Sequence, residues 1–199
     1  MNLSRKGLDF IIAQEATSEA YYTKREARPN WPGVASGVTI GIGYDLGYNN
    51  IVQVTRDWGA HLFPRNLERL SRYCGVTGEA ANQACVGLHD IVVPWAAACQ
   101  VFEEQTVPRF YLQMLRIYPH AESIPPDAAS ALLSLVFNRG TKLTGERRTE
   151  MLGIRNALAD GKLSEIPALF RKQVRLWPDT EGLRDRRVAE AELFAQALV

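Results

Sequence analysis

The sequence is poor in cysteine: Cys74, Cys85 and Cys99 are the only three in 199 residues. An odd number without the spacing of metal ligands argues against a disulfide framework and a cysteine-based metal site. Cys85 and Cys99 lie in alanine-rich, helix-prone sequence, which favours buried, inert thiols. A Cys74–Cys85 bridge in an oxidising compartment is the alternative. The three histidines are scattered, so we expect no metal site.

Long hydrophobic runs are also missing. No segment approaches the ~20 apolar residues that a membrane-spanning helix requires. The N-terminal apolar stretch is too short for a signal peptide and is interrupted by Asp9. We therefore expect a soluble product that is made in the cytoplasm without a signal peptide and has no membrane span.

Neither sign of charge dominates. The chain carries 23 basic and 22 acidic side chains, a formal net charge of +1, and both halves are nearly balanced. Such a chain has no electrostatic reason to bind nucleic acid or a membrane surface. Its hydrophobic content of 46% is enough for a substantial core in one domain of this length.

The first helix can be placed from its capping and its apolar spacing. Ser4 is a predicted N-cap, with Leu3 and Leu8 positioned as a hydrophobic staple. Leu8, Ile11, Ile12 and Glu15 follow the i, i+3, i+4, i+7 pattern of one helix face. A carboxylate in an apolar stripe is desolvated, which raises its pKa and suits a proton donor.

The alternative for Glu15 is a structural ion pair in the core, with Arg139, Arg148 or Arg187 as the partner. A second arginine group, Arg184, Arg186 and Arg187, alternates with acidic residues near the C-terminus. The i,i+4 spacing of Arg186 and Glu190 predicts a solvated, salt-bridged helix face.

From residue 21 to about residue 50 the sequence changes to short β-prone runs punctuated by glycine and proline, which predicts a small hairpin-rich lobe. Tyr21, Tyr22 and Trp31 would form its miniature core. We expect one α+β domain over 1–199, with a β lobe at about 20–60 and a helical lobe at about 61–199 that includes the N-terminal helix. The expected later helices are 64–73, 79–88, 95–118, 126–138, 150–159, 163–175 and 183–198.

Thr39 and Asp45 lie six residues apart in the β-prone segment. In one extended strand they would be separated by ~20 Å, too far to serve one bond. A turn at Gly41–Gly43 would fold Asp45 back beside Thr39, because glycine permits the backbone angles of such a turn. The alternatives are a turn-capping role for Asp45 and an ordinary strand position for Thr39.

Glu15 and the segment 36–47, Ser-Gly-Val-Thr-Ile-Gly-Ile-Gly-Tyr-Asp-Leu-Gly, resemble the active-site region of the phage-type lysozymes. Within that superfamily they are most similar to the pesticin-type muramidases of bacteriocins and secreted antibacterial effectors. The likeness extends to residues 131–140, which resemble the central helix and cleft loop, and to Trp177 with residues 182–194, which resemble the closing segment.

The resemblance implies a lysozyme-like α+β fold and a catalytic set of Glu15, Asp45 and Thr39. Glu15 would be the general acid and Asp45 the base that positions the attacking water. Thr39 would assist in orienting that water. The common phage lysozymes carry the aspartate six residues before the threonine, where this chain has Gly33; in the pesticin-type branch it follows by six, as Asp45 does. The other carboxylates near the cleft, Glu19 and Glu26, are alternatives for the base.

Asn138, in the polar loop over 138–148, is the candidate for a substrate-binding hydrogen bond in the cleft, and a solvated inter-helix loop is the alternative. The resemblance implies two further expectations. Hydrolysis would invert the anomeric carbon, which requires carboxyl groups ~6.5–9.5 Å apart. No metal or organic cofactor is implied.

The expected function is therefore a peptidoglycan muramidase that cleaves the β-1,4 bond between N-acetylmuramic acid and N-acetylglucosamine. It would act in the periplasm of a target or host bacterium, as an antibacterial effector toxin or a bacteriolytic lysis enzyme, and as a monomer. Peptidoglycan strands, an immunity protein and a delivery machinery are the implied partners. A lytic transglycosylase and a catalytically inactive cell-wall binding module are the alternatives.

Overall fold

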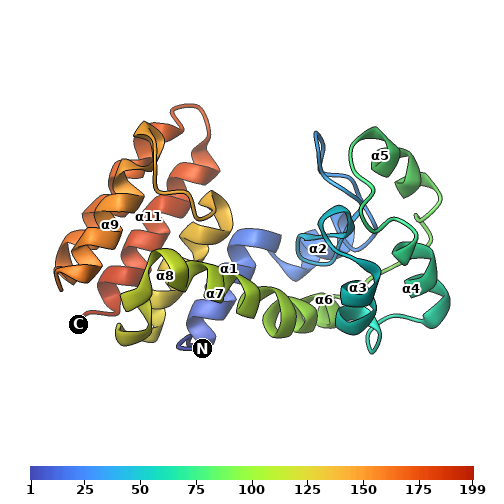
Figure 1. Ribbon diagram of the computed structural model, residues 1–199, viewed down its shortest axis with the longest axis horizontal. Helices are drawn as coiled ribbons and strands as arrows, with labels where there is room; N and C mark the ends of the chain where they lie inside the picture. Colours follow the sequence, from blue (N-terminus) through green and yellow to red (C-terminus); the bar gives the residue numbers. More distant parts are fainter. The chain divides into compact units, whose positions relative to one another are not determined.

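Helices make up most of the structure, a computed structural model that describes all residues 1–199, and a single two-stranded antiparallel sheet accompanies them (Figure 1). The α+β class predicted from the sequence is confirmed at this level. None of the helices combines the length and apolar composition that a bilayer span requires.

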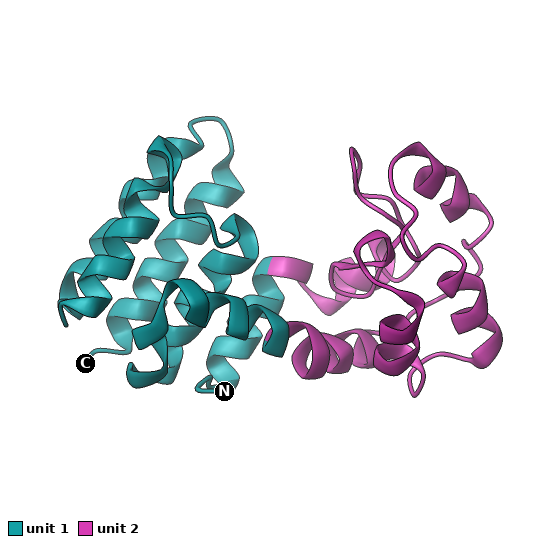
Figure 2. Ribbon diagram, in the orientation of Figure 1, with its two compact units in different colours: residues 1–14, 108–199 teal, residues 15–107 magenta.

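The chain divides into two compact units (Figure 2). Unit 1 comprises residues 1–14 and 108–199, and unit 2 comprises residues 15–107. The sequence suggested two lobes that meet near residue 60. Segments on both sides of that point pair within unit 2, because Gly37 forms a β-bridge with Thr77 and the amide of Gly75 donates to the carbonyl of Leu46 at 3.1 Å.

Unit 1 is helical. Its elements are most of α1 (Arg5–Ala16), α7 (Val107–Ile117), η3 (Pro119–Ser123), α8 (Pro126–Arg139), η4 (Glu146–Arg148), α9 (Thr149–Ala159), η5 (Leu163–Glu165), α10 (Ile166–Lys172), η6 (Gln173–Leu176) and α11 (Glu181–Gln196). The amide of Gly7 donates to Ser4 Oγ at 2.8 Å, which confirms the predicted N-cap of the first helix.

Helix α8 forms the centre of unit 1, and every residue from Ala128 to Val136 is buried. A helix that is apolar on all sides must be surrounded by other elements. Helix α11 packs against α8 and α10. Between α10 and α11 the rings of Phe170 and Phe194 lie 6.1 Å apart.

The prediction of a solvated arginine face on α11 is wrong for two of its three arginines. Arg187 is fully buried and Arg186 is 6% exposed. Both bind the buried Glu190, at 2.6 Å and 3.2 Å, and Arg186 also donates to the carbonyl of Ser134 at 2.9 Å. Buried charges persist where partners satisfy them. Here Glu190 lies one turn along the same helix, and tertiary packing adds Ser134 of α8.

Unit 2 contains the sheet and the shorter helices. Its elements are α2 (Glu19–Arg25), β1 (Thr39–Ile40), β2 (Tyr44–Asp45), η1 (Leu46–Tyr48), α3 (Ile51–Trp58), α4 (Pro64–Ser71), α5 (Glu79–Val86), α6 (Trp95–Val101) and the π-helical turn η2 (Phe102–Thr106). Tyr22 and Trp58 are fully buried at its core. The hydroxyl of Tyr22 donates to the carbonyl of Val93 at 3.0 Å.

Two local predictions in unit 2 differ from the structure. The β-prone segment expected from residue 21 begins instead with helix α2, which is capped by Ser18 through a 3.2 Å bond from the amide of Tyr21. The helix expected over 95–118 is interrupted by η2, where the amide of Val107 donates to Phe102, five residues back. Pro108 follows directly and has no amide hydrogen to continue a regular helix.

Candidate functional site

The hairpin predicted between Thr39 and Asp45 is confirmed. Strands β1 and β2 pair so that Thr39 lies opposite Asp45 and Ile40 opposite Tyr44. Gly41 and Gly43 have φ angles of 56° and 65°, in the left-handed region that glycine adopts without strain. The chain thus reverses direction over three residues.

The turn is held in place by close packing on α3. A Cβ atom added to Gly41 would lie 2.6 Å from the ring of Trp58, whereas one added to Gly43 would have no neighbour within 4 Å. The ring of Tyr44 meets that of Trp58 edge-on at 5.5 Å, and the Tyr44 hydroxyl donates to Asp57 at 2.8 Å. These contacts position strand β1 and its Thr39.

Glu15 and Thr39 line the same pocket in unit 2, with a volume of about 360 Å³. Glu15 is half-buried and is the second-last residue of α1, whereas Thr39 is 6% exposed and belongs to β1. The remaining lining residues are Tyr21, Arg25, Glu26, Asn30, Gly41 and Gly43. The structure therefore brings together two of the three catalytic residues predicted from the sequence.

The second carboxylate of this pocket is Glu26. It is the C-cap of α2 and is half-buried, and burial raises the pKa of its carboxyl above the ordinary value. The β-bridge between Asn30 and Thr39 holds the segment after α2 beside β1. The family resemblance ranked Asp45 above Glu26, and no periodic signal in the sequence shows that the chain after α2 aligns with Thr39.

Asp45 is not among the residues that line this pocket. Its two carboxylate oxygens each accept a hydrogen bond from the amide of Gly37 at 3.0 Å, and Oδ1 also accepts one from Gly47 at 2.8 Å. These bonds join β2 to the segment before β1 and start η1. The observed contacts of the Asp45 side chain are thus those of a turn cap.

The other predicted candidates lie elsewhere. Glu19 is exposed in the first turn of α2 and does not line the pocket. Asn138 is exposed near the end of α8, in unit 1. Of the aromatics expected in the lobe core, Tyr22 is buried whereas Tyr21 is 45% exposed and contributes to the pocket wall.

Arg25 brings a cationic group to the same pocket, so its lining combines two carboxylates, a guanidinium, an amide, a hydroxyl and a phenol. Convergent polar groups of this kind suit a hydroxyl-rich ligand, whose many donors and acceptors each need a partner. The pair of carboxylates additionally permits proton transfer to and from such a ligand.

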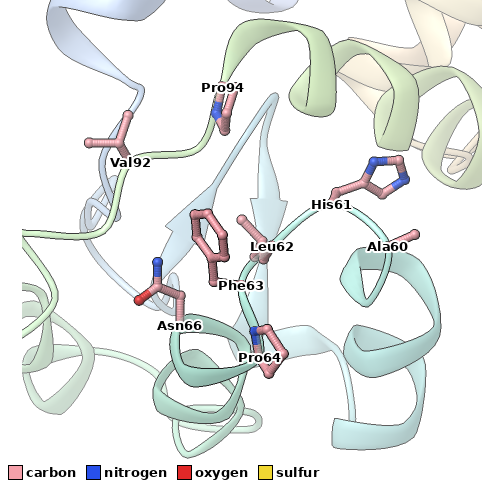
Figure 3. Close-up of a pocket in the computed structure, with 8 residues that line it drawn as sticks. All are labelled: Ala60, His61, Leu62, Phe63, Pro64, Asn66, Val92 and Pro94. Carbon is pink, nitrogen blue, oxygen red and sulfur yellow. The ribbon is translucent and has the colours of Figure 1, made fainter.

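A second pocket of unit 2 offers a contrast. It has a volume of about 250 Å³ and is lined by Ala60, His61, Leu62, Phe63, Pro64, Asn66, Val92 and Pro94 (Figure 3). His61 is the only ionisable side chain among them, and no carboxylate is present. This pocket therefore lacks the acid–base pair that the Glu15 pocket contains.

The structure contains no group of three or more His, Cys, Asp or Glu side chains arranged to hold a metal ion. The three cysteines are free and half-buried.

Comparisons with known proteins leave the family open. No protein-family model matches the chain, and no curated protein matches it either.

Proposed function

We propose that this protein is a peptidoglycan hydrolase of lysozyme-like fold that cleaves the β-1,4 bond between N-acetylmuramic acid and N-acetylglucosamine. One observation carries the proposal: Glu15 and Thr39, from separate elements, line one pocket together with a second carboxylate, Glu26. Most glycosidases hydrolyse a glycosidic bond with two carboxyl groups that flank it, one to protonate the leaving oxygen and one to act on the opposite face.

The roles follow from the surroundings of each group. Glu15 is the general acid that the family resemblance assigns. Thr39 would orient the attacking water through its hydroxyl, which makes only a long contact of 3.4 Å to the carbonyl of Gly37. The position of Thr39 beside the turn glycines leaves its side chain at the pocket wall.

The base has two candidates, Asp45 from the resemblance and Glu26 from the pocket. Asp45 already accepts main-chain amides of Gly37 and Gly47. Glu26 lines the pocket, and its pKa is raised by burial toward the pH at which acid–base catalysis is most efficient. We therefore favour Glu26 as the second carboxylate and a structural role for Asp45.

Digestion of purified sacculi tests the proposal. Wild type, Glu15→Gln, Glu26→Gln and Asp45→Asn would be compared for their soluble products by mass spectrometry, with the folded fraction of each variant measured by circular dichroism. We expect reducing muramic acid ends from wild type and a loss of rate of about 10²-fold or more in Glu15→Gln and Glu26→Gln. Asp45→Asn should lose rate only in proportion to its loss of folded protein.

Other outcomes would redirect the assignment. Anhydro-muramic ends would identify a lytic transglycosylase, which needs one acid and no water. A folded Asp45→Asn protein with no activity, beside an active Glu26→Gln, would return the base to Asp45. Wild type that binds sacculi without cleaving them would leave a cell-wall binding module and contradict the hydrolase.

The biological setting belongs to the same proposal. A muramidase of this kind would act on periplasmic peptidoglycan of a target or host bacterium, as an antibacterial effector or a lysis enzyme. An immunity protein and a delivery machinery are the partners that this role implies.

A further inference from the structure

Unit 1 contains a group of arginines between helices α8 and α9 that the proposed reaction does not use. Arg139 is the last residue of α8, and Arg147 and Arg148 end the short helix η4 that precedes α9. We refer to Arg139, Arg147 and Arg148 as the arginine cluster. Arg147 is exposed, and the other two are half-buried.

The cluster is held by specific contacts. Arg139 Nη2 donates to the carbonyl of Arg147 at 2.6 Å, and its Cζ lies 4.8 Å from the centre of the Trp177 ring. Arg147 Nη2 in turn donates to the carbonyl of Leu176 at 3.2 Å. Main-chain carbonyls thus hold the guanidinium groups of Arg139 and Arg147, and an aromatic face backs that of Arg139. Arg148 Nη1 donates to Met151 Sδ at 3.3 Å.

No carboxylate forms an ion pair with any of the three arginines. Two buried carboxylates of unit 1 are paired with other arginines, because Glu150 binds Arg175 at 2.8 Å and Glu190 binds Arg187 at 2.6 Å. The Nε atom of Arg139 is buried and has no hydrogen-bond partner. A buried donor without an acceptor is costly, and an added acceptor would relieve that cost.

Two further features point the same way. Burial, followed by the charges of Arg148, Arg187 and Arg147, lowers the pKa of Arg139 to about 10. Helix α9 begins directly after Arg148 and has no side-chain cap at its N-terminus. The positive end of a helix dipole therefore adds to the positive potential of the cluster.

We propose that the arginine cluster, backed by Trp177 and the N-terminus of α9, is a binding site for an oxyanion, either a carboxylate or a phosphate. Guanidinium groups recognise both through paired N–H donors. The site would hold an acidic group of a ligand or a free anion. It stands independently of the proposed hydrolysis, because an oxyanion carries no glycosidic bond.

Calorimetric titration tests the site with two probes, inorganic phosphate and the dipeptide L-alanyl-γ-D-glutamate, at constant ionic strength maintained with chloride. The proteins are wild type, Arg147→Gln, Arg148→Gln and, as the control, Arg171→Gln, which removes an exposed arginine of α10 in the same unit. Arg139 is left unchanged because its packing on Trp177 would make its loss a folding defect.

We expect wild type to bind at least one probe and both cluster variants to bind it at least fivefold more weakly, with Arg171→Gln unchanged. Selective binding of the dipeptide would identify a carboxylate ligand, and selective binding of phosphate a phosphate ligand. Binding of neither probe would overturn the proposal. Equal weakening in Arg171→Gln and in the cluster variants would also overturn it, since diffuse net charge would then explain the effect.

Discussion

The two acidic side chains Glu26 and Asp45 differ in what surrounds their carboxyl groups. Glu26 is half-buried at the Glu15 pocket, and burial is the cause that raises its pKa. The carboxylate of Asp45 instead accepts hydrogen bonds from the main-chain amides of Gly37 and Gly47. A side-chain carboxylate is therefore destabilised in its charged form by burial at Glu26, whereas at Asp45 it is stabilised by hydrogen bonds from the main chain.

Replacing Glu26 should raise stability at neutral pH. Because the folded protein holds the Glu26 proton more tightly than the unfolded chain, the free energy of unfolding falls as pH rises from the ordinary carboxyl pKa through the raised one. Glu26→Gln has no proton to release, so its free energy of unfolding does not fall in this pH range. We expect its Tm to exceed that of wild type by about 1–3 °C at pH 7 and by nothing measurable at pH 3.5. A lower Tm at pH 7 would contradict this assignment.

Replacing Asp45 should lower stability, because its carboxylate caps a turn through main-chain amides. Asp45→Asn retains one acceptor oxygen for the amides of Gly37 and Gly47, so we expect a loss of about 1–2 kcal/mol in urea unfolding. Asp179→Asn, at an exposed position, is the control and should be neutral. Equal stability of both variants would remove the structural role from Asp45.

Among the elements, the hairpin β1–β2 has the strictest local requirements. Gly41 needs a positive φ and also packs against Trp58, whereas Gly43 needs only the positive φ. The two glycines therefore separate the backbone requirement from the packing requirement.

Alanine at these two positions should have unequal effects. Gly43→Ala should cost about 1–2 kcal/mol, the strain of a side chain in the left-handed region. Gly41→Ala adds a clash with a buried indole, so we expect a total of about 3 kcal/mol or more. Urea unfolding of both variants measures the difference. Equal losses would show that the Trp58 ring moves aside without cost.

At the scale of the whole molecule, the two units have differently composed interiors. The core of unit 2 centres on Tyr22 and Trp58, while unit 1 buries Arg186, Arg187 and Glu190 beside the apolar helix α8. A charged interior is stable only while every member retains its partners.

Glu190→Gln should therefore destabilise unit 1 strongly. Its carboxylate is the shared partner of Arg186 and Arg187, so its neutralisation leaves two buried cations without their counter-charge. We expect a loss of about 3–5 kcal/mol and faster hydrogen exchange in α8 and α11. Glu192→Gln, an exposed neighbour on the same helix, is the control. Unchanged exchange in Glu190→Gln would show that the arginines find other partners.

The sequence by itself determined the features that depend on nearby residues. The Ser4 cap, the Gly41–Gly43 turn and most helices after residue 60 were predicted within a few residues of their observed bounds, since capping, glycine angles and apolar periodicity act over one or two turns. Helix α3 at 51–58, inside the predicted β lobe, and the break at η2 in the predicted 95–118 helix were missed. The same periodicity placed Glu15 on the first helix, and the structure shows it near the end of that helix.

Only the tertiary structure decided which residues share a site. Whether Glu26 or Asp45 joins Glu15 and Thr39 depends on the pairing of Asn30 with Thr39 and on the amides that approach Asp45. The burial of Arg186 and Arg187 and the division into units depend likewise on contacts between distant segments. Such contacts are made by the packing of whole elements, and local sequence pattern carries no record of them.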